Sequence, residues 1–184
     1  MEPERVSIVI PAYDEAEAIG TVVRQMAGAF PACELIVVDD GSGDETGRIA
    51  GEAGARVVTH PSNLGYGASL RTGVDAASRP WVLFCDGDGQ HSPEDVGRVM
   101  EACDDVDMVV GTRDGETHVP LLRRPGKFVL ISFADFLAGE KLPDFNSGLR
   151  IVRKEVLLKY IHLMPRGFSF STTTTFAMLK GMRR

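Results

Sequence analysis

The stretch Trp81-Val82-Leu83-Phe84-Cys85-Asp86-Gly87-Asp88 joins an apolar run directly to an acidic, glycine-containing turn. A short apolar run bounded by turn residues is typical of a buried strand, so we predict a strand over residues 81–84. Further apolar runs with polar or glycine-containing turns behind them occur at residues 6–10, 35–38, 56–59 and 108–110. The sequence therefore predicts a succession of short strands, each followed by a turn.

Helices are predicted between these strands, at residues 15–30, 45–53, 67–77 and 93–103. Asp44 and Ser92 are the expected N-caps of the second and fourth helix, and Pro93 and Asp95 suit the first and third helical positions after Ser92. Regular alternation of strand and helix is the signature of a parallel sheet. We therefore expect an α/β fold with a mostly parallel central sheet.

The pattern changes at about Gly111, where a polar loop containing arginine and proline begins. An apolar segment at residues 128–137 and a turn at residues 142–148 follow, and helices are predicted at residues 154–162 and 172–180. We interpret residues 113–184 as the second half of one domain that spans residues 1–184.

The composition excludes several classes of protein. The formal charge of −6 disfavours a protein that binds nucleic acid, because phosphate binding needs an excess of Lys and Arg. Cys33, Cys85 and Cys103 form no C-x-x-C pair, so neither a disulfide framework nor a zinc site is predicted, and a reducing, cytoplasmic setting fits. No run reaches the roughly 18 apolar residues of a membrane span.

Acidic side chains follow the predicted strands, in loops at residues 11–15, 39–44 and 86–91. Asp, Gly and Ser are also ordinary turn formers, and that alternative applies to each loop alone. Ligands of an open α/β sheet bind at the carboxyl ends of the strands, where all of these loops are expected. Clustered carboxylates repel one another, so a fold that collects them needs a cation or hydrogen-bond donors nearby.

Asp86, Asp88 and Gln90 alternate along the turn that follows the predicted strand at residues 81–84. A tight turn can direct two carboxylates and an amide oxygen at one hard cation, and Mg²⁺ or Mn²⁺ suits such ligands. This cation completes its coordination with phosphate oxygens and would neutralise a diphosphate leaving group.

The loop at residues 60–67 contains Asn63, Gly65 and Gly67 and opens a predicted helix that carries Arg71. The helix start could face a phosphate, or the glycines could simply serve the turn. Neither a G-x-x-x-x-G-K-[ST] loop nor a G-x-G-x-x-G loop after the first strand is present, which disfavours a nucleoside triphosphatase and a Rossmann dehydrogenase.

Four of these segments together resemble the family 2 glycosyltransferases: Ser7-Ile8-Val9-Ile10-Pro11-Ala12-Tyr13-Asp14-Glu15, Val37-Val38-Asp39-Asp40-Gly41-Ser42, Asn63-Leu64-Gly65-Tyr66-Gly67 and Asp86-Gly87-Asp88-Gly89-Gln90-His91. Residues 144–150 and 167–170 are similar to the branch that contains dolichol-phosphate mannosyltransferase and related polyprenol-phosphate glycosyltransferases. The resemblance implies a GT-A fold, which is Rossmann-like, with helices on both faces of the sheet. It also implies that residues 1–112 bind the nucleotide sugar and residues 113–184 the acceptor.

The resemblance further implies roles for individual residues. Nucleotide-sugar binding is expected of Pro11, Tyr13, Glu15, Asp40, Ser42, Asn63, Gly65, Arg71 and Asp86. Asp86, Asp88 and Gln90 are expected to bind the metal, and Asp88, Arg113 and Arg150 to act in catalysis. Arg113, Ser147 and Arg150 are expected to face the acceptor phosphate, the alternative being ordinary surface arginines and a turn serine. The donor is left open between GDP-mannose and a UDP-hexose.

The expected acceptor is a polyprenyl (dolichyl) phosphate. Its second pKa of about 6 makes it largely an oxyanion at neutral pH, so it needs no general base. It needs cationic groups that hold it in line with the sugar C1, where its attack inverts the anomeric centre. The second half offers Arg113, Arg123, Arg124, Arg150 and Arg153 for this purpose, and the Q-x-x-R-W element of processive synthases is absent.

The segment at residues 127–137, with Arg123 and Arg124 before it, is hypothesised to lie on the cytoplasmic membrane face; the alternative is that it is core. The chain ends at Arg184, where relatives continue, so the usual C-terminal extension is expected to be missing. Two other functions stay open. One is a glycosyltransferase of the same fold with a soluble or hydroxyl acceptor, and the other is a nucleotide-sugar-binding module without turnover.

Overall fold

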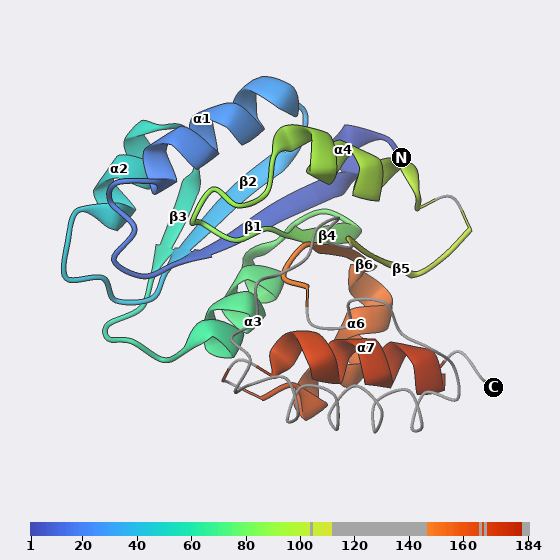
Figure 1. Ribbon diagram of the computed structural model, residues 1–184. Helices are drawn as coiled ribbons and strands as arrows, with labels where there is room; N and C mark the ends of the chain where they lie inside the picture. The colour runs from blue at the N-terminus through green and yellow to red at the C-terminus, as the bar shows by residue number, and fades with distance from the viewer. Residues whose placement is uncertain (104, 112–146, 166, 168, 182–184) are drawn as a thin grey trace, which may run out of the picture.

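The computed structural model describes residues 1–103, 105–111, 147–165, 167 and 169–181 (Figure 1). Its centre is a sheet in which the described strands follow the order β3-β2-β1-β4-β6-β5. The strands are β1 (Val6–Ala12), β2 (Glu34–Asp39), β3 (Arg56–Thr59), β4 (Trp81–Phe84), β5 (Met108–Val110) and β6 (Arg150–Arg153). β1 pairs in parallel with both β2 and β4, and β2 pairs in parallel with β3. The prediction of a mostly parallel sheet is confirmed.

β6 is the strand that the sequence did not predict. It lies between β4 and β5 and runs antiparallel to both. Its four residues, Arg150–Arg153, begin and end with arginine, so they lack the continuous apolar pattern that marks the other strands. The strand is specified by pairing with segments 40 or more residues away in the sequence, and a local pattern does not record such partners.

Helices cover both faces of the sheet, as expected. The described helices are α1 (Ile19–Ala29), α2 (Thr46–Glu52), α3 (Tyr66–Ala76), α4 (Pro93–Glu101), α6 (Lys154–Tyr160) and α7 (Phe170–Gly181), with 3-10 turns η1 (Pro3–Arg5) and η3 (Ile161–Leu163). In Figure 1, α1, α2 and α4 lie above the sheet, and α3, α6 and α7 lie below it. Alternate residues of β1 point to opposite faces of the sheet. Ile8 and Ile10 belong to the hydrophobic core between the sheet and α1 and α4, whereas Val9 belongs to the core between the sheet and α3.

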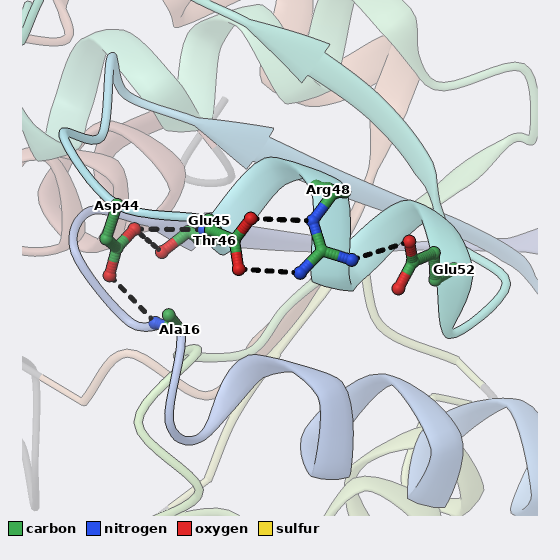
Figure 2. Close-up of polar contacts among 6 residues, drawn as sticks. All are labelled: Ala16, Asp44, Glu45, Thr46, Arg48 and Glu52. Atoms are coloured by element: carbon green, nitrogen blue, oxygen red, sulfur yellow. Dashed lines mark hydrogen bonds and ion pairs between the residues drawn. The ribbon is translucent and has the colours of Figure 1, made fainter.

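The helix starts explain where the predictions were right and where they were wrong. Ser92 is the N-cap of α4 in a reciprocal capping box with Asp95, and Pro93 takes the first helical position, as predicted. Asp44 is not the N-cap of α2, because Glu45 occupies that position. Asp44 lies one residue earlier, and its carboxylate accepts hydrogen bonds from the amide and the hydroxyl of Thr46 (Figure 2).

α3 lies unusually close to β1. A Cβ at Gly73 would overlap Val9 Cγ1, so only glycine permits this approach. The contact sets the distance between α3, whose first residue is Tyr66, and the sheet. Within the described part of the chain, no helix has the length and apolar character needed to cross a bilayer.

Candidate functional site

The loops after β1, β2 and β4 meet at one edge of the sheet. Register brings the last residues of β1 and β2, Ala12 and Asp39, side by side, and β4 is the other neighbour of β1. The first two loops are tied together by polar contacts, because the Asp14 amide donates to Ser42 Oγ at 3.0 Å and the Gly43 amide donates to Asp14 Oδ1 at 2.8 Å. The expected convergence of the loops at residues 11–15 and 39–44 is therefore present.

Further contacts fix the loop that carries Glu15. The Glu15 amide donates to Thr46 Oγ1 at 2.8 Å. The Ala16 amide donates to Asp44 Oδ2 at 3.1 Å (Figure 2). On the exposed side of α2, Arg48 forms ion pairs with both Glu45 and Glu52. The hydrogen bonds of the Glu15 and Ala16 amides anchor the loop after β1 to the start of α2.

Glu15 lies in a field of negative charge. Its pKa is raised above the ordinary value, first by burial and then by the charges of Asp88 and Asp44. The same field reaches Cys85, because burial and, to a smaller extent, the charges of Asp86 and Asp88 together raise the pKa of its thiol to about 12. Cys85 therefore stays protonated at neutral pH. Like charges gathered in this way favour a cation, which would lower their repulsion.

Asp86 is the most enclosed carboxylate of the β4 loop. Its side chain is 23% exposed, and its Oδ1 accepts a hydrogen bond from Tyr66 Oη at 3.0 Å. His91 Nε2 lies 3.6 Å from the other oxygen, Oδ2. The backbone at Gly148 closes a further side, because a Cβ there would lie 2.9 Å from Asp86 Cγ.

Asp88 and Gln90 are exposed beside this enclosed carboxylate. The backbone amide of Gln90 donates to Asp88 Oδ1 at 3.0 Å, and this hydrogen bond keeps the two residues close together in the turn. Carboxylate and amide oxygens are hard donors that fit Mg²⁺ or Mn²⁺. Among the described residues, no group of three or more His, Cys, Asp or Glu side chains is arranged to hold a metal. A cation at Asp86 and Asp88 would therefore depend on other oxygens, such as those of a bound phosphate, which is usual for Mg²⁺.

Asp40 is directed into the protein. It is 4% exposed, its Oδ1 lies 2.6 Å from His60 Nδ1 and accepts from the Leu64 amide, and its Oδ2 accepts from the Gly65 amide. His60 Nε2 in turn lies 2.8 Å from Thr72 Oγ1 on α3. Burial alone would raise the pKa of Asp40, but the hydrogen bonds from His60 and the two amides lower it below the ordinary value. Asp40 thus holds the loop that leads into α3, and its expected contact with the nucleotide stays a prediction.

The other residues expected to bind the nucleotide sugar lie around these loops. Pro11 is buried at the end of β1, Tyr13 is 47% exposed, Ser42 is half-buried and Asn63 is exposed. Gly65 adopts φ 98°, a left-handed value that favours glycine, immediately before α3. Arg71 Nη1 donates to the Met164 carbonyl at 3.0 Å, so this arginine ties α3 to the segment after η3.

The five arginines that the sequence offered for the acceptor phosphate occupy different places. Arg113 lies outside the described residues, as do residues 123–137. Arg150 is 1% exposed, and its guanidinium donates to the carbonyls of Ser147 and Ser171 and to Thr175 Oγ1. Arg153 pairs with Trp81 at the opposite end of β4 and its guanidinium lies over the Trp81 ring, so it is remote from the acidic loops.

Ser147 is placed beside the acidic loops. It is 3% exposed, it precedes Gly148, which packs on Asp86, and its hydroxyl has no hydrogen-bond partner among the described residues. The structure therefore brings Ser147 next to the predicted metal site. Arg150 stabilises the turn that contains Ser147 and Gly148, because its guanidinium donates hydrogen bonds to the Ser147 carbonyl.

Sequence reasoning missed Tyr66, His60, His91 and Gly148. Each lies inside or beside a segment whose motif had been noted, but none of the four had been given a role. For the tyrosine and the two histidines the available signal was their position in those motifs, since carboxylates that bind a metal are in turn held by hydrogen-bonding partners.

Known proteins are similar to this chain over most of its length. Residues 7–161 match the family model described as glycosyl transferase family 2. The polyprenol monophosphomannose synthase of Mycolicibacterium smegmatis is 32% identical over 174 residues, which cover 85% of this chain and 64% of that protein. The dolichyl-phosphate hexose transferase of Haloferax volcanii is 32% identical over 154 residues, which cover 82% of this chain and 67% of that protein.

Solved structures show the same fold. Glucosyl-3-phosphoglycerate synthase from Mycobacterium tuberculosis, in complex with phosphoglyceric acid, superposes with a TM-score of 0.73 at 26% identity, covering 92% of this chain and 63% of that chain. The same enzyme with Mn²⁺, UDP-glucose and phosphoglyceric acid gives a TM-score of 0.74 at 23% identity, with the same coverage. The chain thus spans about two thirds of the length of these relatives.

Proposed function

Because the chain belongs to glycosyl transferase family 2, we propose that it transfers a sugar from a nucleotide sugar to the phosphate of a polyprenyl phosphate, with inversion at the sugar C1. The observation that carries the proposal is the meeting of three acidic loops at the carboxyl edge of the sheet, where the charge of Asp88 acts on Glu15. A nucleoside diphosphate with a divalent cation satisfies such a site, because the cation offsets the carboxylates and the phosphates complete its coordination.

In this mechanism the loops after β1 and β2 bind the nucleotide, and Tyr13 offers its exposed ring to the base. Asp86, Asp88 and Gln90 would hold Mg²⁺ or Mn²⁺, which when bound would neutralise the departing diphosphate. Tyr66 keeps the Asp86 carboxylate in place through its hydroxyl. Ser147 lies on the turn against Asp86 and would meet the acceptor phosphate.

The acceptor is proposed from its chemistry and from the relatives. A phosphate monoester is already an oxyanion nucleophile at neutral pH, so the site must orient it and need not deprotonate it. The similar proteins from M. smegmatis and H. volcanii are named for transfer to polyprenol or dolichyl phosphate. We assign acceptor binding to residues 113–184, with Arg113 as an arginine that contacts the phosphate and Arg150 as the residue that holds the Ser147 turn beside it, and we propose that the reaction takes place at the cytoplasmic membrane face.

The test is a transfer assay with radiolabelled GDP-mannose, UDP-glucose and UDP-N-acetylglucosamine, each with a polyprenyl phosphate and with Mn²⁺ or a chelator. We expect one donor to give a lipid-linked product that needs the cation, and we expect Asp88→Ala to lose nearly all of it. Product formed by Asp88→Ala at the parent rate would remove the metal role of this residue. Donor binding without any transfer would instead support a binding module.

A soluble acceptor is the second candidate. The likeness to glucosyl-3-phosphoglycerate synthase, solved with phosphoglyceric acid, favours a small phosphorylated acceptor for the same site. Including 3-phosphoglycerate as a parallel acceptor separates the two. A water-soluble labelled product with no lipid-linked product would decide for this alternative.

A further inference from the structure

His91 is buried beside the metal site in a way that the proposed reaction does not yet use. Its side chain is 5% exposed, and its Nε2 is one of two buried side-chain polar atoms that have no hydrogen-bond partner among the described residues. A buried polar group left unpaired costs free energy, so such groups normally have a partner in the working state of a protein.

The direction of this nitrogen identifies the partner. Nε2 lies 3.6 Å from Asp86 Oδ2, just beyond hydrogen-bond distance, so a small rotation of the carboxylate or the ring would join them. The opposite carboxylate oxygen, Oδ1, already accepts from Tyr66 Oη at 3.0 Å. The two oxygens of one carboxylate therefore face two different side chains, from the start of α3 and from the loop before α4.

The backbone completes the enclosure. Gly148 packs so closely against Asp86 that a Cβ at position 148 would lie 2.9 Å from Cγ and from Oδ1, and closer to Oδ2. Asp86 is thus confined by α3, by the loop before α4 and by the turn before β6. Asp88, two residues later, is exposed. Among the described residues, its carboxylate accepts a hydrogen bond from the backbone amide of Gln90.

We propose that His91 is a positioning residue that works with Tyr66. The two side chains hold the Asp86 carboxylate in the orientation that a divalent cation requires, and His91 itself touches neither the cation nor the sugar. Partners of this kind raise metal affinity because the ligand needs no reorganisation when the cation arrives. The inference rests on the proposed metal role of Asp86 and adds the residues that make Asp86 an effective ligand.

The test measures Mn²⁺ binding directly, by the electron paramagnetic resonance signal of free Mn²⁺ in the presence of UDP or of GDP. We expect His91→Leu and Tyr66→Phe each to weaken Mn²⁺ binding by about 10–100-fold, the usual effect of removing such a partner. His91→Gln keeps an N–H donor at a similar distance from the backbone and should recover most of the affinity. Nucleotide binding measured in a chelator should be the same in all variants.

Matched controls are available in the same chain. His162→Leu and Tyr160→Phe make the same chemical changes around η3 and should leave Mn²⁺ affinity unaltered. Circular dichroism and the melting temperature establish that each variant folds, and if His91→Leu does not fold, His91→Gln and Tyr66→Phe still decide the matter.

Three results would overturn the inference. Unchanged Mn²⁺ affinity in folded His91→Leu would show that His91 positions nothing. Nitrogen coupling to bound Mn²⁺ that disappears in His91→Leu would make His91 a direct ligand. Absence of Mn²⁺ binding in the wild-type chain with either nucleotide would remove the metal role itself, and with it the proposed function, before any variant is compared.

Discussion

Single atoms decide the shape of the site, and Gly148 shows this most clearly. No side chain fits at this position, because a Cβ would press on Asp86, the carboxylate that is also bound by Tyr66. The close approach lets the turn before β6 reach the loop after β4. The addition of one methyl group at Gly148 should therefore displace the Asp86 side chain.

We predict that Gly148→Ala lowers both Mn²⁺ affinity and the rate of sugar transfer by at least about 10-fold, because a displaced ligand behaves like one that has lost its outer partner. The added methyl group should also destabilise the fold by about 1–3 kcal/mol, the usual cost of overpacking. Mn²⁺ titration and urea unfolding measure the two effects.

Gly28→Ala is the matched control. A Cβ at Gly28 on α1 would meet nothing within 4 Å, so this variant should keep its activity and gain about 0.5–1 kcal/mol of stability from the higher helix propensity of Ala. If Gly148→Ala behaved like Gly28→Ala, the packing of the turn against Asp86 would have no functional meaning.

At this scale the sequence identified the candidate metal ligands, whose role stays a prediction, but not their surroundings. Asp86, Asp88 and Gln90 were identifiable because alternation along one turn is a local property. The roles of Tyr66 and His91 depend on where α3 and α4 begin relative to the end of β4. That relation is set by tertiary contacts such as Gly73 against Val9, which no spacing in the sequence expresses.

At the scale of elements, the loop between β3 and α3 is fastened to the end of β2. Asp40 accepts two amides of this loop, and His60 connects Asp40 to Thr72 on α3. Since the pKa of Asp40 is lowered in the folded protein, the ionised form stabilises the native state. The loop, and the Tyr66 that follows it, should therefore depend on this ionised carboxylate.

We predict that Asp40→Asn lowers the free energy of unfolding at pH 7 by about 1.5–3 kcal/mol, the worth of hydrogen bonds to a charged group. The contribution of Asp40 is complete above its unfolded pKa of about 3.9 and is lost as the pH falls through the lower folded pKa. The difference between wild type and variant should therefore begin to shrink as the pH falls below about 4.

Urea unfolding at several pH values gives this comparison, with the exposed Asp75→Asn on α3 as the control. A difference that stays constant or widens on acidification would contradict the assignment of Asp40 as the fastening carboxylate.

The elements themselves were predicted unevenly for a physical reason. β3, β4 and β5 have the predicted bounds, and the cap at Ser92 was predicted, because apolar runs and capping residues are local signals. β6 was missed because its position depends on pairing with β4 and β5. Asp44 was misplaced by one residue because its carboxylate satisfies the Thr46 amide from outside the helix.

At the scale of the whole molecule, the order of the strands creates the site. β1 has β2 on one side and β4 on the other, and the helices that follow these strands lie on the upper face in Figure 1 while α3 lies on the lower face. The strand order reverses at β1, because the chain proceeds from β1 to β2 and β3 on one side and then continues with β4 on the other. In open α/β sheets, ligands bind at such a reversal, outside the carboxyl ends of the strands. The loops of β1, β2 and β4 surround this point and carry the acidic residues.

The central claim is that this edge binds a nucleoside diphosphate through a divalent cation. The most direct test is the melting temperature of the wild-type chain and of Asp88→Ala, with UDP or GDP and with Mn²⁺ or a chelator, because a ligand that binds only the native state must stabilise it. We predict that one nucleotide raises the melting temperature of the wild type in the presence of Mn²⁺ and that the rise is lost in the chelator and in Asp88→Ala. No rise with either nucleotide, or an equal rise in Asp88→Ala, would contradict the claim.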